Sequence, residues 1–429
     1  MTTPMEIAYY TQCFAPEIGA PSARVRELSR EWVASGERVQ VVTCFPNHPI
    51  GRLYPGYQPA WYMHEVMDGI EVHRHRTYLT PNAGFLKRTL SQASFVPAAL
   101  GISNRRLRKP DVMIGTSPSL FGAVAADISA RRFRVPFVME VRDLWPAAIA
   151  GLGVLKNGRV LRMLERIELG LYRRATEIVV VTEAFRRNLV ERGVPEDKVH
   201  VVPNGADLDF WSADLARPED LRRQLGLEGK FVVLYIGAHG MSQALHRMLD
   251  SAESLRDLPQ VEFVFVGEGA EKARLIEEAS NRRLPNIRFL PPVDKDAVRD
   301  YYAASDVCLV PLRDIPLFDA FLPSKMFEIM AMGRPMIGSL RGEAAELLRR
   351  ADAGIVVEPE DSAGIAQAVR TLVANPRRGD WMGESGKRHV QQNYARAALA
   401  SQYRDVLCKA CAKSHRVPGS SMVSERRAA

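Results

Sequence analysis

Continuous apolar runs alternate with amphipathic stretches along most of this chain, and the alternation predicts strands followed by helices. The pattern opens with an apolar strand at residues 5–10, a helix at 23–35 with its apolar residues on one stripe, and a second strand at 38–43. Strands without polar alternation, separated by helices, are typical of parallel sheets that are covered on both faces. The pattern therefore predicts an α/β fold built from strand–helix–strand units.

The pattern is interrupted once and then restarts, which indicates two domains. Residues 207–230 are polar and contain Pro218, Gly226 and Gly229, and a new apolar strand begins at Phe231. We therefore predict the following organisation: a Rossmann-like domain at 1–210, a second one at 211–392, a C-terminal helix at 393–412 and a disordered tail at 413–429. Ligands of such sheets bind at the carboxyl ends of the strands.

The most informative segment is a short helix in the second half, in the block from Leu322 to Pro335. Ser324 is a favoured N-cap residue, and Gly333 is expected to end the helix. Lys325 and Glu328 are three residues apart and share one face of the first turn. A lysine at a helix N-terminus suits an anion, and a carboxylate one turn later suits a pair of hydroxyls, as in a nucleotide. On this segment alone, an ordinary capped helix with a charged first turn is the simpler interpretation.

Polar residues also gather at predicted strand ends in the first half. Gly19 lies in the loop after the first strand and can bring backbone amides close to a phosphate. Arg142 and Asp143 follow an apolar strand that begins at Pro136 and contains Glu140. The alternatives are a ligand site at the sheet edge and a buried ion pair that closes the strand, and we favour the site. His73 and His75 fall on one side of a strand; without a recognised third ligand they predict a polar strand face, and we expect no metal site.

Composition narrows the class of protein without choosing a ligand. The net charge of +8 favours anionic partners, and the basic residues lack the interleaved aromatic residues of a nucleic-acid surface. No apolar run is long enough to span a bilayer, the N-terminus has no secretory pattern, and most of the five cysteines lie in apolar surroundings. These features predict a cytoplasmic protein. Residues 85–109 combine apolar and basic positions, which fits either an interfacial helix on an anionic membrane or a core helix with a basic end.

Several motifs, taken in order over roughly residues 5 to 410, resemble the retaining glycosyltransferases of family 4, which have the GT-B architecture. The motifs of the second half are Val202-Pro-Asn-Gly-Ala-Asp207, Tyr235-Ile-Gly237, Val266-Gly-Glu-Gly269, Asp306-Val-Cys-Leu-Val-Pro311 and the block ending in Gly333-Arg-Pro335. In the first half, Phe14-Ala-Pro-Glu-Ile-Gly19 and Val141-Arg-Asp-Leu-Trp-Pro146 are similar to a bacterial subgroup that builds surface polysaccharides, including the O-antigen fucosamine transferases.

The resemblance implies two facing Rossmann-like domains, with the C-terminal helix possibly crossing back to the first. It implies transfer of a sugar with retention from a nucleoside diphosphate sugar, such as a UDP-N-acetylhexosamine, to a hydroxyl acceptor that is a sugar or a lipid-linked sugar. No cofactor and no metal are expected, and a peripheral position on the inner face of the membrane fits a lipid-linked acceptor. The implied catalytic residues are Asp143, Lys325 and Glu328. The implied donor-binding residues are Gly19, Gly237, His239, Gly240, Met241, Gly267, Leu290, Val293, Phe321, Leu322, Ser324, Lys325 and Glu328. The implied acceptor-binding residues are Glu17, His48 and Asp143.

Two departures from the family pattern concern charge in the donor site. Family members carry two glutamates with seven residues between them; Glu328 fits the second, and the first position falls on Ala320. Many members also have an arginine and a lysine after the Tyr-Ile-Gly strand, where residues 238–243 here supply neither. Lys325 is therefore the main candidate for charge on the diphosphate, with Lys272 as a more remote one.

Two further functions remain open at this stage. The first is a UDP-sugar epimerase or hydrolase of the same architecture, which would consume the donor without an acceptor. The second is a non-catalytic nucleotide-sugar-binding protein, which the missing acid at Ala320 would permit.

Overall fold

The chain folds into two compact α/β units. The computed structural model describes residues 4–48, 51–80, 85–117, 119–151, 153 and 157–415. The first unit is drawn from Met1–Val181, Phe185–Val202 and Leu399–Ala429, and the second from Thr182–Ala184 and Pro203–Ala398. The first unit therefore contains segments from both ends of the chain.

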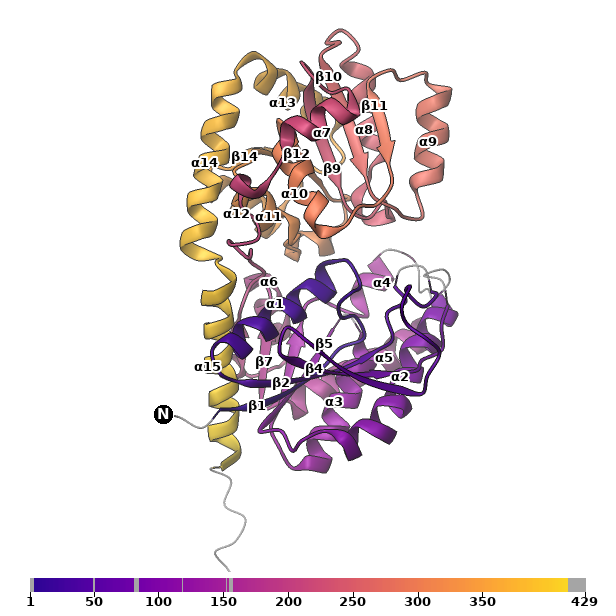
Figure 1. Ribbon diagram of the computed structural model, residues 1–429, viewed down its shortest axis with the longest axis vertical. Helices are drawn as coiled ribbons and strands as arrows, with labels where there is room; N and C mark the ends of the chain where they lie inside the picture. The colour runs from indigo at the N-terminus through magenta and orange to yellow at the C-terminus, as the bar shows by residue number, and fades with distance from the viewer. Residues whose placement is uncertain are drawn as a thin grey trace, which may run out of the picture. The chain divides into compact units, whose positions relative to one another are not determined.

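The first unit is built on an eight-stranded sheet with the order β3-β4-β2-β1-β5-β6-β7-β8, parallel except for β3 (Figure 1). Its strands are β1 Glu6–Tyr10, β2 Arg38–Cys44, β3 Tyr62–Met67, β4 Ile70–His75, β5 Val112–Thr116, β6 Phe137–Val141, β7 Glu177–Val180 and β8 Val199–Val201. Its helices are α1 Ala20–Ala34, α2 Phe85–Arg106, α3 Leu120–Phe133, α4 Ala147–Gly151, α5 Gly158–Arg174, the 3₁₀ turn η1 Glu196–Lys198 and most of α15 Arg396–His415. Helix α6 Glu183–Glu191 begins in the segment assigned to the second unit.

The C-terminal helix α15 completes the core of the first unit. Its apolar residues from Leu399 to Ala410 pack in one cluster with Trp32 of α1 and with residues of β1 and β2. The Trp32 indole nitrogen Nε1 donates a hydrogen bond to the Ala400 carbonyl at 2.9 Å, and Tyr403 meets the indole edge-on. The predicted return of the C-terminal helix to the first domain is confirmed. The helix extends to His415, past the predicted end at residue 412, and the rest of the predicted tail lies outside the described residues.

Helix α2 buries only part of the apolar surface of the stretch at 85–109. Phe95, Ala99 and Ser103 lie four residues apart and are buried, so this stripe packs into the unit, where α2 contacts α3. Leu90 is largely exposed on another face. Pro97 lies inside the helix without ending it. The buried stripe fits the core-helix alternative, while a membrane face on the remaining surface stays a prediction.

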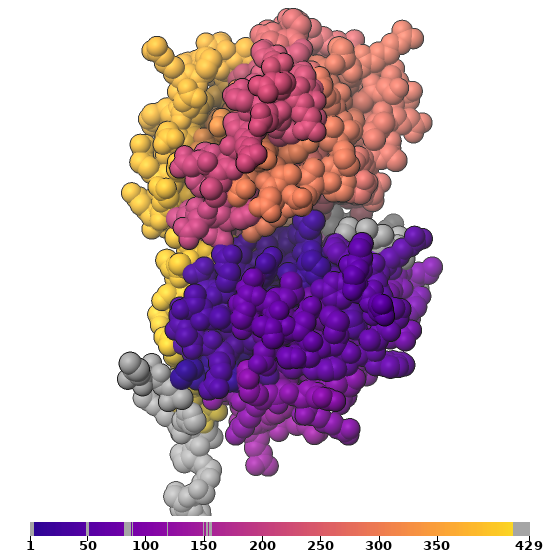
Figure 2. Space-filling view, viewed as in Figure 1, coloured from indigo at the N-terminus to yellow at the C-terminus, as the bar shows by residue number. Residues whose placement is uncertain are grey.

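The second unit is built on a fully parallel six-stranded sheet with the order β11-β10-β9-β12-β13-β14. Its strands are β9 Phe231–Ile236, β10 Val261–Val266, β11 Ile287–Leu290, β12 Val307–Pro311, β13 Met336–Ser339 and β14 Gly354–Val357. Its helices are η2 Ala213–Leu215, α7 Pro218–Leu225, η3 Met241–Gln243, α8 His246–Ser254, α9 Lys272–Asn281, α10 Lys295–Ala304, η4 Pro316–Ala320, α11 Lys325–Ala331, α12 Gly342–Arg350, α13 Ser362–Ala374 and α14 Pro376–Asn393. Helices α7 and α10 pack against each other on the near side of this unit (Figures 1 and 2).

Helix α14 was not expected from the sequence, because its glycines disfavour an isolated helix. Those glycines allow close packing against the candidate site helix α11 and the residues that follow it. A Cβ atom on Gly383 would lie 2.1 Å from the Gly333 carbonyl oxygen, and one on Gly386 would lie 3.1 Å from the Met330 side chain. Tertiary packing therefore outweighs helix propensity here, and α14 supports α11 from behind.

Across the described ranges, none of the helices is both long enough and apolar enough to cross a bilayer.

Candidate functional site: the strand ends of the second unit

The strand order of the second unit creates a topological switch point beside β9. From β9 the chain adds β10 and β11 on one side, and then returns to add β12, β13 and β14 on the other. Ligands of doubly wound sheets bind at this position, outside the carboxyl ends of the strands. Many of the predicted donor-binding residues end or directly follow β9, β10 and β11, so they gather along this edge.

The glycines that end β9 and β10 are required by close backbone approach. A Cβ atom on Gly267 would lie 1.9 Å from the Gly237 carbonyl oxygen, and one on Gly269 would lie 2.3 Å from the His239 carbonyl oxygen. Gly237 and Gly267 also have φ angles of 141°, which residues with side chains rarely adopt. The two predicted motifs Tyr235-Ile-Gly237 and Val266-Gly-Glu-Gly269 therefore form one compact pair of turns.

Lys325 reaches this edge from the segment that follows β12. Its ammonium nitrogen Nζ donates a hydrogen bond to the Ile236 carbonyl at 2.8 Å and lies 4.2 Å from the centre of the Tyr235 ring. A Cβ atom on Gly237 would lie 2.8 Å from Nζ, so the glycine also makes room for the amine. Burial lowers the pKa of Lys325 to about 8, although the Glu328 carboxylate favours the charged form.

The helix that carries Lys325 begins where the sequence predicts, but its cap differs. Helix α11 begins at Lys325, yet the Ser324 backbone is itself helical and its side chain makes no capping hydrogen bond. The first turn is closed instead by the Phe327 amide, which donates to the Ser324 carbonyl at 3.1 Å. Because α11 has seven residues, positive charge at this edge comes from the lysine rather than from a long helix dipole.

Glu328 is fixed by a tyrosine that the sequence analysis did not identify. The hydroxyl of Tyr302 on α10 donates a hydrogen bond to Glu328 Oε2 at 3.1 Å, and Tyr302 is fully buried. Burial and the nearby carboxylate raise the pKa of Tyr302 well above its usual value, so it stays a donor. Nothing in the spacing of the sequence pairs these two residues.

Lys272, the more remote cation by sequence, belongs to the same edge. Its Nζ donates to the Gly267 carbonyl at 2.7 Å and to the Leu290 carbonyl at 3.0 Å, which joins the ends of β10 and β11. The signal in the sequence is its place three residues after Gly269. Two lysine amines thus lie on main-chain carbonyls at the ends of three neighbouring strands.

His239 lies in the turn after β9 and is fully buried. Its ring meets Tyr235, Phe265 and Phe289, and neither ring nitrogen has a hydrogen-bond partner among the described residues. Burial, assisted by the positive charge of Lys272, lowers the pKa of His239 to about 4. The imidazole is therefore neutral at physiological pH, and it packs the turn rather than adding charge to it.

The other predicted donor-binding residues line the same edge or the segment before α11. Gly240 and Met241 begin the 3₁₀ turn η3, where Met241 is exposed. Val293 follows β11 and is partly buried. Phe321 and Leu322 follow η4 and precede Lys325, and Phe321 packs edge-on against Phe318 at 5.4 Å between ring centres. Gly19 belongs to the first unit.

The candidate acceptor residues of the first unit lie in loops at its strand ends. Glu17 is buried, and its Oε1 accepts hydrogen bonds from the amides of Asn47 at 2.7 Å and His48 at 2.8 Å. Burial raises the pKa of Glu17, and these amides oppose the increase. His48 itself is exposed. Glu17 therefore holds the loop that presents His48.

Gly19 and Asp143 are connected through Arg142. Gly19 is exposed at the start of α1, and the Arg142 guanidinium donates to the carbonyls of Ala20 at 2.7 Å and Pro21 at 3.0 Å. The amides of Arg142 and Asp143 both donate to the Ser117 hydroxyl, at 2.8 and 3.3 Å. The structure thus brings the loops of Gly19 and Asp143 side by side within the first unit.

Glu140 forms the buried ion pair that the sequence analysis considered as an alternative. Its Oε1 accepts from Arg24 Nε at 2.9 Å and its Oε2 from the Tyr9 hydroxyl at 2.5 Å, and both charged side chains are at most 1% exposed. Burial alone would raise the pKa of Glu140, but the Arg24 charge and the hydrogen bonds lower it. Glu140 therefore belongs to the core rather than to the strand-end surface.

An apolar hollow of about 810 Å³ opens on the first unit, between the loop before β3, the segment after β4 and helix α2. Arg76 lines it and stacks over Trp61, with 5.0 Å between the guanidinium carbon and the ring centre. The other lining residues are Phe45, Leu53, Pro59, Ala60, Thr77, Tyr78, Leu79, Ser94, Pro97, Ala98, Gly101 and Ile102. Its size and lining suit a mainly hydrocarbon ligand.

Two family models match this chain, one in each half. Residues 19–205 match the "Glycosyl transferase 4-like domain", and residues 230–375 match "Glycosyl transferases group 1". Among curated proteins, the chain is 28% identical over 397 residues to the putative colanic acid biosynthesis glycosyl transferase WcaI of Escherichia coli K12, covering 90% of this chain and 97% of that protein. It is 26% identical to the D-rhamnosyltransferase WbpZ of Pseudomonas aeruginosa, covering 75% of this chain and 91% of that protein.

Solved structures share the same architecture. Sucrose-phosphate synthase from Thermosynechococcus elongatus aligns with a TM-score of 0.73 at 18% identity, over 95% of this chain and 100% of that chain. HepE from Anabaena in complex with UDP-glucose aligns with a TM-score of 0.70 at 17% identity, over 94% of this chain and 100% of that chain. The two units and their sheets are those of a GT-B fold. With both halves matched by glycosyltransferase models, this chain belongs to the family 4 glycosyltransferases.

Proposed function

We propose that this enzyme transfers a sugar with retention from a nucleoside diphosphate sugar, with UDP as the nucleotide, to a hydroxyl acceptor in the assembly of a bacterial surface polysaccharide. The observation that carries the proposal is the Lys325 amine at the end of β9, one helical turn from Glu328. The name of WcaI supports the biological role, the name of WbpZ supports sugar transfer, and the UDP-glucose complex of HepE supports the class of donor.

Lys325 would hold the diphosphate of the donor. An ammonium group has three donors, and one of them already binds the Ile236 carbonyl, which leaves two for phosphate oxygens. Amides of the turn at Gly240 and Met241 would add neutral donors. As the bond to the sugar breaks, negative charge grows on the leaving diphosphate, and a fixed cation in a partly buried site stabilises that charge.

Glu328 would hold the ribose. Its Oε2 accepts from Tyr302, and a carboxylate is an acceptor that suits the two hydroxyls of a ribose. Lys272 holds the carbonyls at Gly267 and Leu290 and would shape the edge that faces the base, near Leu290 and Val293. Phe321 and Leu322 would then lie against the sugar. In this arrangement Lys272, Tyr302 and His239 are positioning residues.

Asp143 and His48 would orient the acceptor hydroxyl, with Glu17 fixing the loop of His48 and Gly19 presenting the start of α1. The donor phosphate would help to remove the acceptor proton, and Lys325 would take the place of a divalent ion on the leaving diphosphate. The hollow beside α2 would receive the hydrocarbon part of a lipid-linked acceptor, and Arg76 at its lining would meet the lipid phosphate. Such an acceptor requires a position at the inner face of the membrane.

The direct test is a thermal-shift panel of UDP-, GDP- and dTDP-sugars, followed by product analysis with free and lipid-linked acceptors. We expect a UDP-sugar to raise the melting temperature most, because a ligand that binds only the folded state stabilises it. We then expect transfer to a lipid-linked acceptor, with the anomeric configuration of the donor retained in the product.

Other outcomes of this test identify the alternatives. Turnover of the UDP-sugar without an acceptor would establish an epimerase or hydrolase. Binding without turnover across the acceptor panel would establish a non-catalytic nucleotide-sugar-binding protein. Equal rates of transfer to free and lipid-linked acceptors would show that the hollow does not bind the acceptor.

The pKa of Lys325 predicts how donor binding depends on pH. With a pKa of about 8, the amine is mostly charged near pH 7 and mostly neutral near pH 9.5, so binding an anionic diphosphate at high pH requires uptake of a proton. We expect the KM for the donor to increase by up to about tenfold per pH unit above about pH 8. Initial rates across this range measure the effect.

The control for the pH profile is Lys325→Arg, because a guanidinium keeps its charge throughout this range. Its donor KM should be higher than that of the wild type at neutral pH but nearly independent of pH. The same pH profile in both proteins would assign the titration to another group.

A further inference from the structure

The edge hairpin β3–β4 of the first unit brings three metal-ligating side chains together on one face. In the antiparallel register His64 on β3 lies directly opposite His73 on β4, and Glu71 precedes His73 by two residues, on the same face of the strand. Within the described residues, this is the one group of three such side chains with ligand atoms that all lie within 4.8 Å of one another. The sequence analysis considered His73 with His75 and did not pair it with these two residues.

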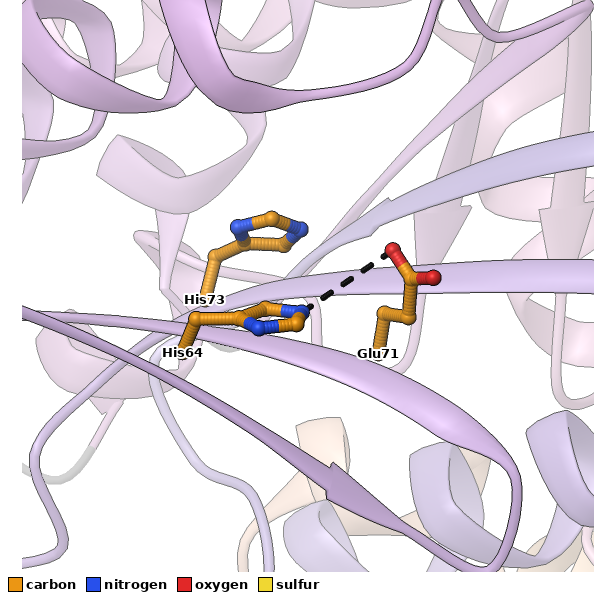
Figure 3. Close-up of side chains that lie close together, drawn as sticks. All are labelled: His64, Glu71 and His73. Carbon is orange, nitrogen blue, oxygen red and sulfur yellow. Dashed lines mark ion pairs between the residues drawn. The ribbon is translucent and has the colours of Figure 1, made fainter.

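The geometry of the three side chains suits a shared ion. The imidazole rings of His64 and His73 lie over one another with centres 5.0 Å apart, and the Glu71 carboxylate lies beside them (Figure 3). His64 Nε2 is 3.9 Å from Glu71 Oε2. Ligand atoms around a zinc ion are about 3.3 Å apart, given metal–ligand distances of about 2.0–2.2 Å. Side-chain rotations that move the ligand atoms by about 1 Å would therefore bring them to bonding distance of one ion without moving the strands.

Neighbouring side chains already hold His73 and Glu71 in orientations that suit a metal ion. The Tyr62 hydroxyl lies 2.9 Å from His73 Nδ1 and can accept its proton, which leaves a lone pair on Nε2. His73 is 3% exposed, and its Nε2 has no hydrogen-bond partner in the described part of the chain. A buried ring nitrogen without a partner is costly for a fold, and a bound ion would satisfy it. Arg108 holds the other oxygen of Glu71, Oε1, at 2.7 Å.

We propose that His64, Glu71 and His73 bind one divalent transition-metal ion, with Zn²⁺ as the best match, outside the sugar-transfer site. Two imidazole nitrogens and one carboxylate oxygen provide three ligands, and water completes the coordination. His64 is 43% exposed, so the ion can enter from solvent. The ion would fasten β3, the edge strand and the single antiparallel strand of this sheet within the described residues, to β4.

The surroundings set the expected strength of binding. Arg108 and Arg106, which lies 5.7 Å from the Tyr62 ring centre, add positive charge near the ion. With three ligands and two nearby cations, we expect weaker binding than in a closed four-ligand zinc site. The ion would therefore bind reversibly and stabilise the pairing of β3 with β4, and the fold would not depend on it.

The test uses the full chain without an affinity tag, treated with EDTA and dialysed. Titration with Zn²⁺ by calorimetry should give one ion per chain, and Co²⁺ should give the visible absorption of a nitrogen- and oxygen-bound ion. His64→Ala and Glu71→Gln should each weaken binding by at least tenfold, and both side chains are accessible enough to be replaced without unfolding the unit. Zn²⁺ should also slow hydrogen exchange of the β3 and β4 amides in the wild type but not in these two variants.

The matched control is His246→Ala. This histidine is similarly exposed and lies 4.0 Å from a carboxylate, Glu360, but it belongs to the second unit, and no second histidine of the described ranges joins them. Its variant should bind Zn²⁺ as the wild type does. The proposal is overturned if no ion binds at one per chain, or if His64→Ala and Glu71→Gln both retain wild-type affinity.

Discussion

Replacing Lys325 by alanine should lower kcat/KM for sugar transfer by about 100-fold, through a lower kcat and a higher KM for the donor. The amine is the cation nearest the end of β9, and the turn at 238–243 supplies no lysine or arginine that would replace it. Removal of one fixed donor to a developing negative charge typically costs a factor of about 10²–10³ in kcat. Steady-state kinetics with saturating acceptor measure the change, and circular dichroism checks the fold.

Lys230→Ala is the matched control for this variant. Lys230 immediately precedes β9, at the opposite end of the same strand, and its Nζ also donates to a main-chain carbonyl, that of Pro259 at 2.8 Å. Both substitutions remove a partly buried lysine and one carbonyl hydrogen bond, but only one of them lies at the carboxyl edge. If the two variants lose activity equally, the site is misplaced.

Glu328→Ala completes the experiment on this helix. It should raise the donor KM by more than tenfold, because the ribose loses its acceptor, and a charge-assisted hydrogen bond contributes about 1.5–3 kcal/mol. Tyr302→Phe removes only the hydroxyl that orients Glu328, so its effect should be smaller and confined to KM. Full activity in both Lys325→Ala and Glu328→Ala would reject the proposed donor site.

Replacing Glu140 by glutamine should destabilise the first unit by about 3–5 kcal/mol, because the substitution removes the carboxylate that pairs with the buried Arg24 charge. The pair lies in the core and not on the surface, and Arg24 also holds the Val202 carbonyl at 2.9 Å. Urea titration, followed by hydrogen exchange of peptides from β1 and β6, measures the change within this unit and avoids assuming that both units unfold together.

Asp68→Asn is the comparison for the buried pair. Asp68 binds Arg26 at 2.7 Å, but both side chains are at least one-third exposed, and exposed pairs contribute about 0.2–1 kcal/mol. Asparagine also tolerates the positive φ angle at this position. Similar losses from Glu140→Gln and Asp68→Asn would show that the Glu140 carboxylate is not held in a dry core.

The fold was predictable where one residue pattern has one structural solution. Apolar strands such as 5–10 and 231–236 are buried on both faces in parallel sheets, so their burial is visible in the sequence. Helix α14 was not predictable, because Gly383 and Gly386 disfavour an isolated helix. In the folded chain, their close packing on Gly333 and Met330 stabilises it. Helix α7 was also missed, within the polar segment taken as a domain boundary.

The candidate site was predictable as a set of residues but not as an arrangement. The spacing of Lys325 and Glu328 and the glycines of two strand ends were visible in the sequence. The residues that pair with this site were not visible in the sequence. Tyr302 reaches Glu328 from another helix, and Lys272 reaches carbonyls at the ends of two strands. Side-chain pairing across elements depends on the strand order, which a linear pattern does not contain.

By itself, the sequence determined the α/β class, the two units, the family resemblance and the residue types available for binding a nucleotide sugar, because these follow from periodicity and from local motifs. Only the tertiary structure decided that Glu140 closes a buried ion pair with Arg24, that Glu17 holds a loop, and that His64 faces His73. The physical reason is that burial and pairing set what a charged or titratable group does, and both arise from neighbours that are distant in the chain.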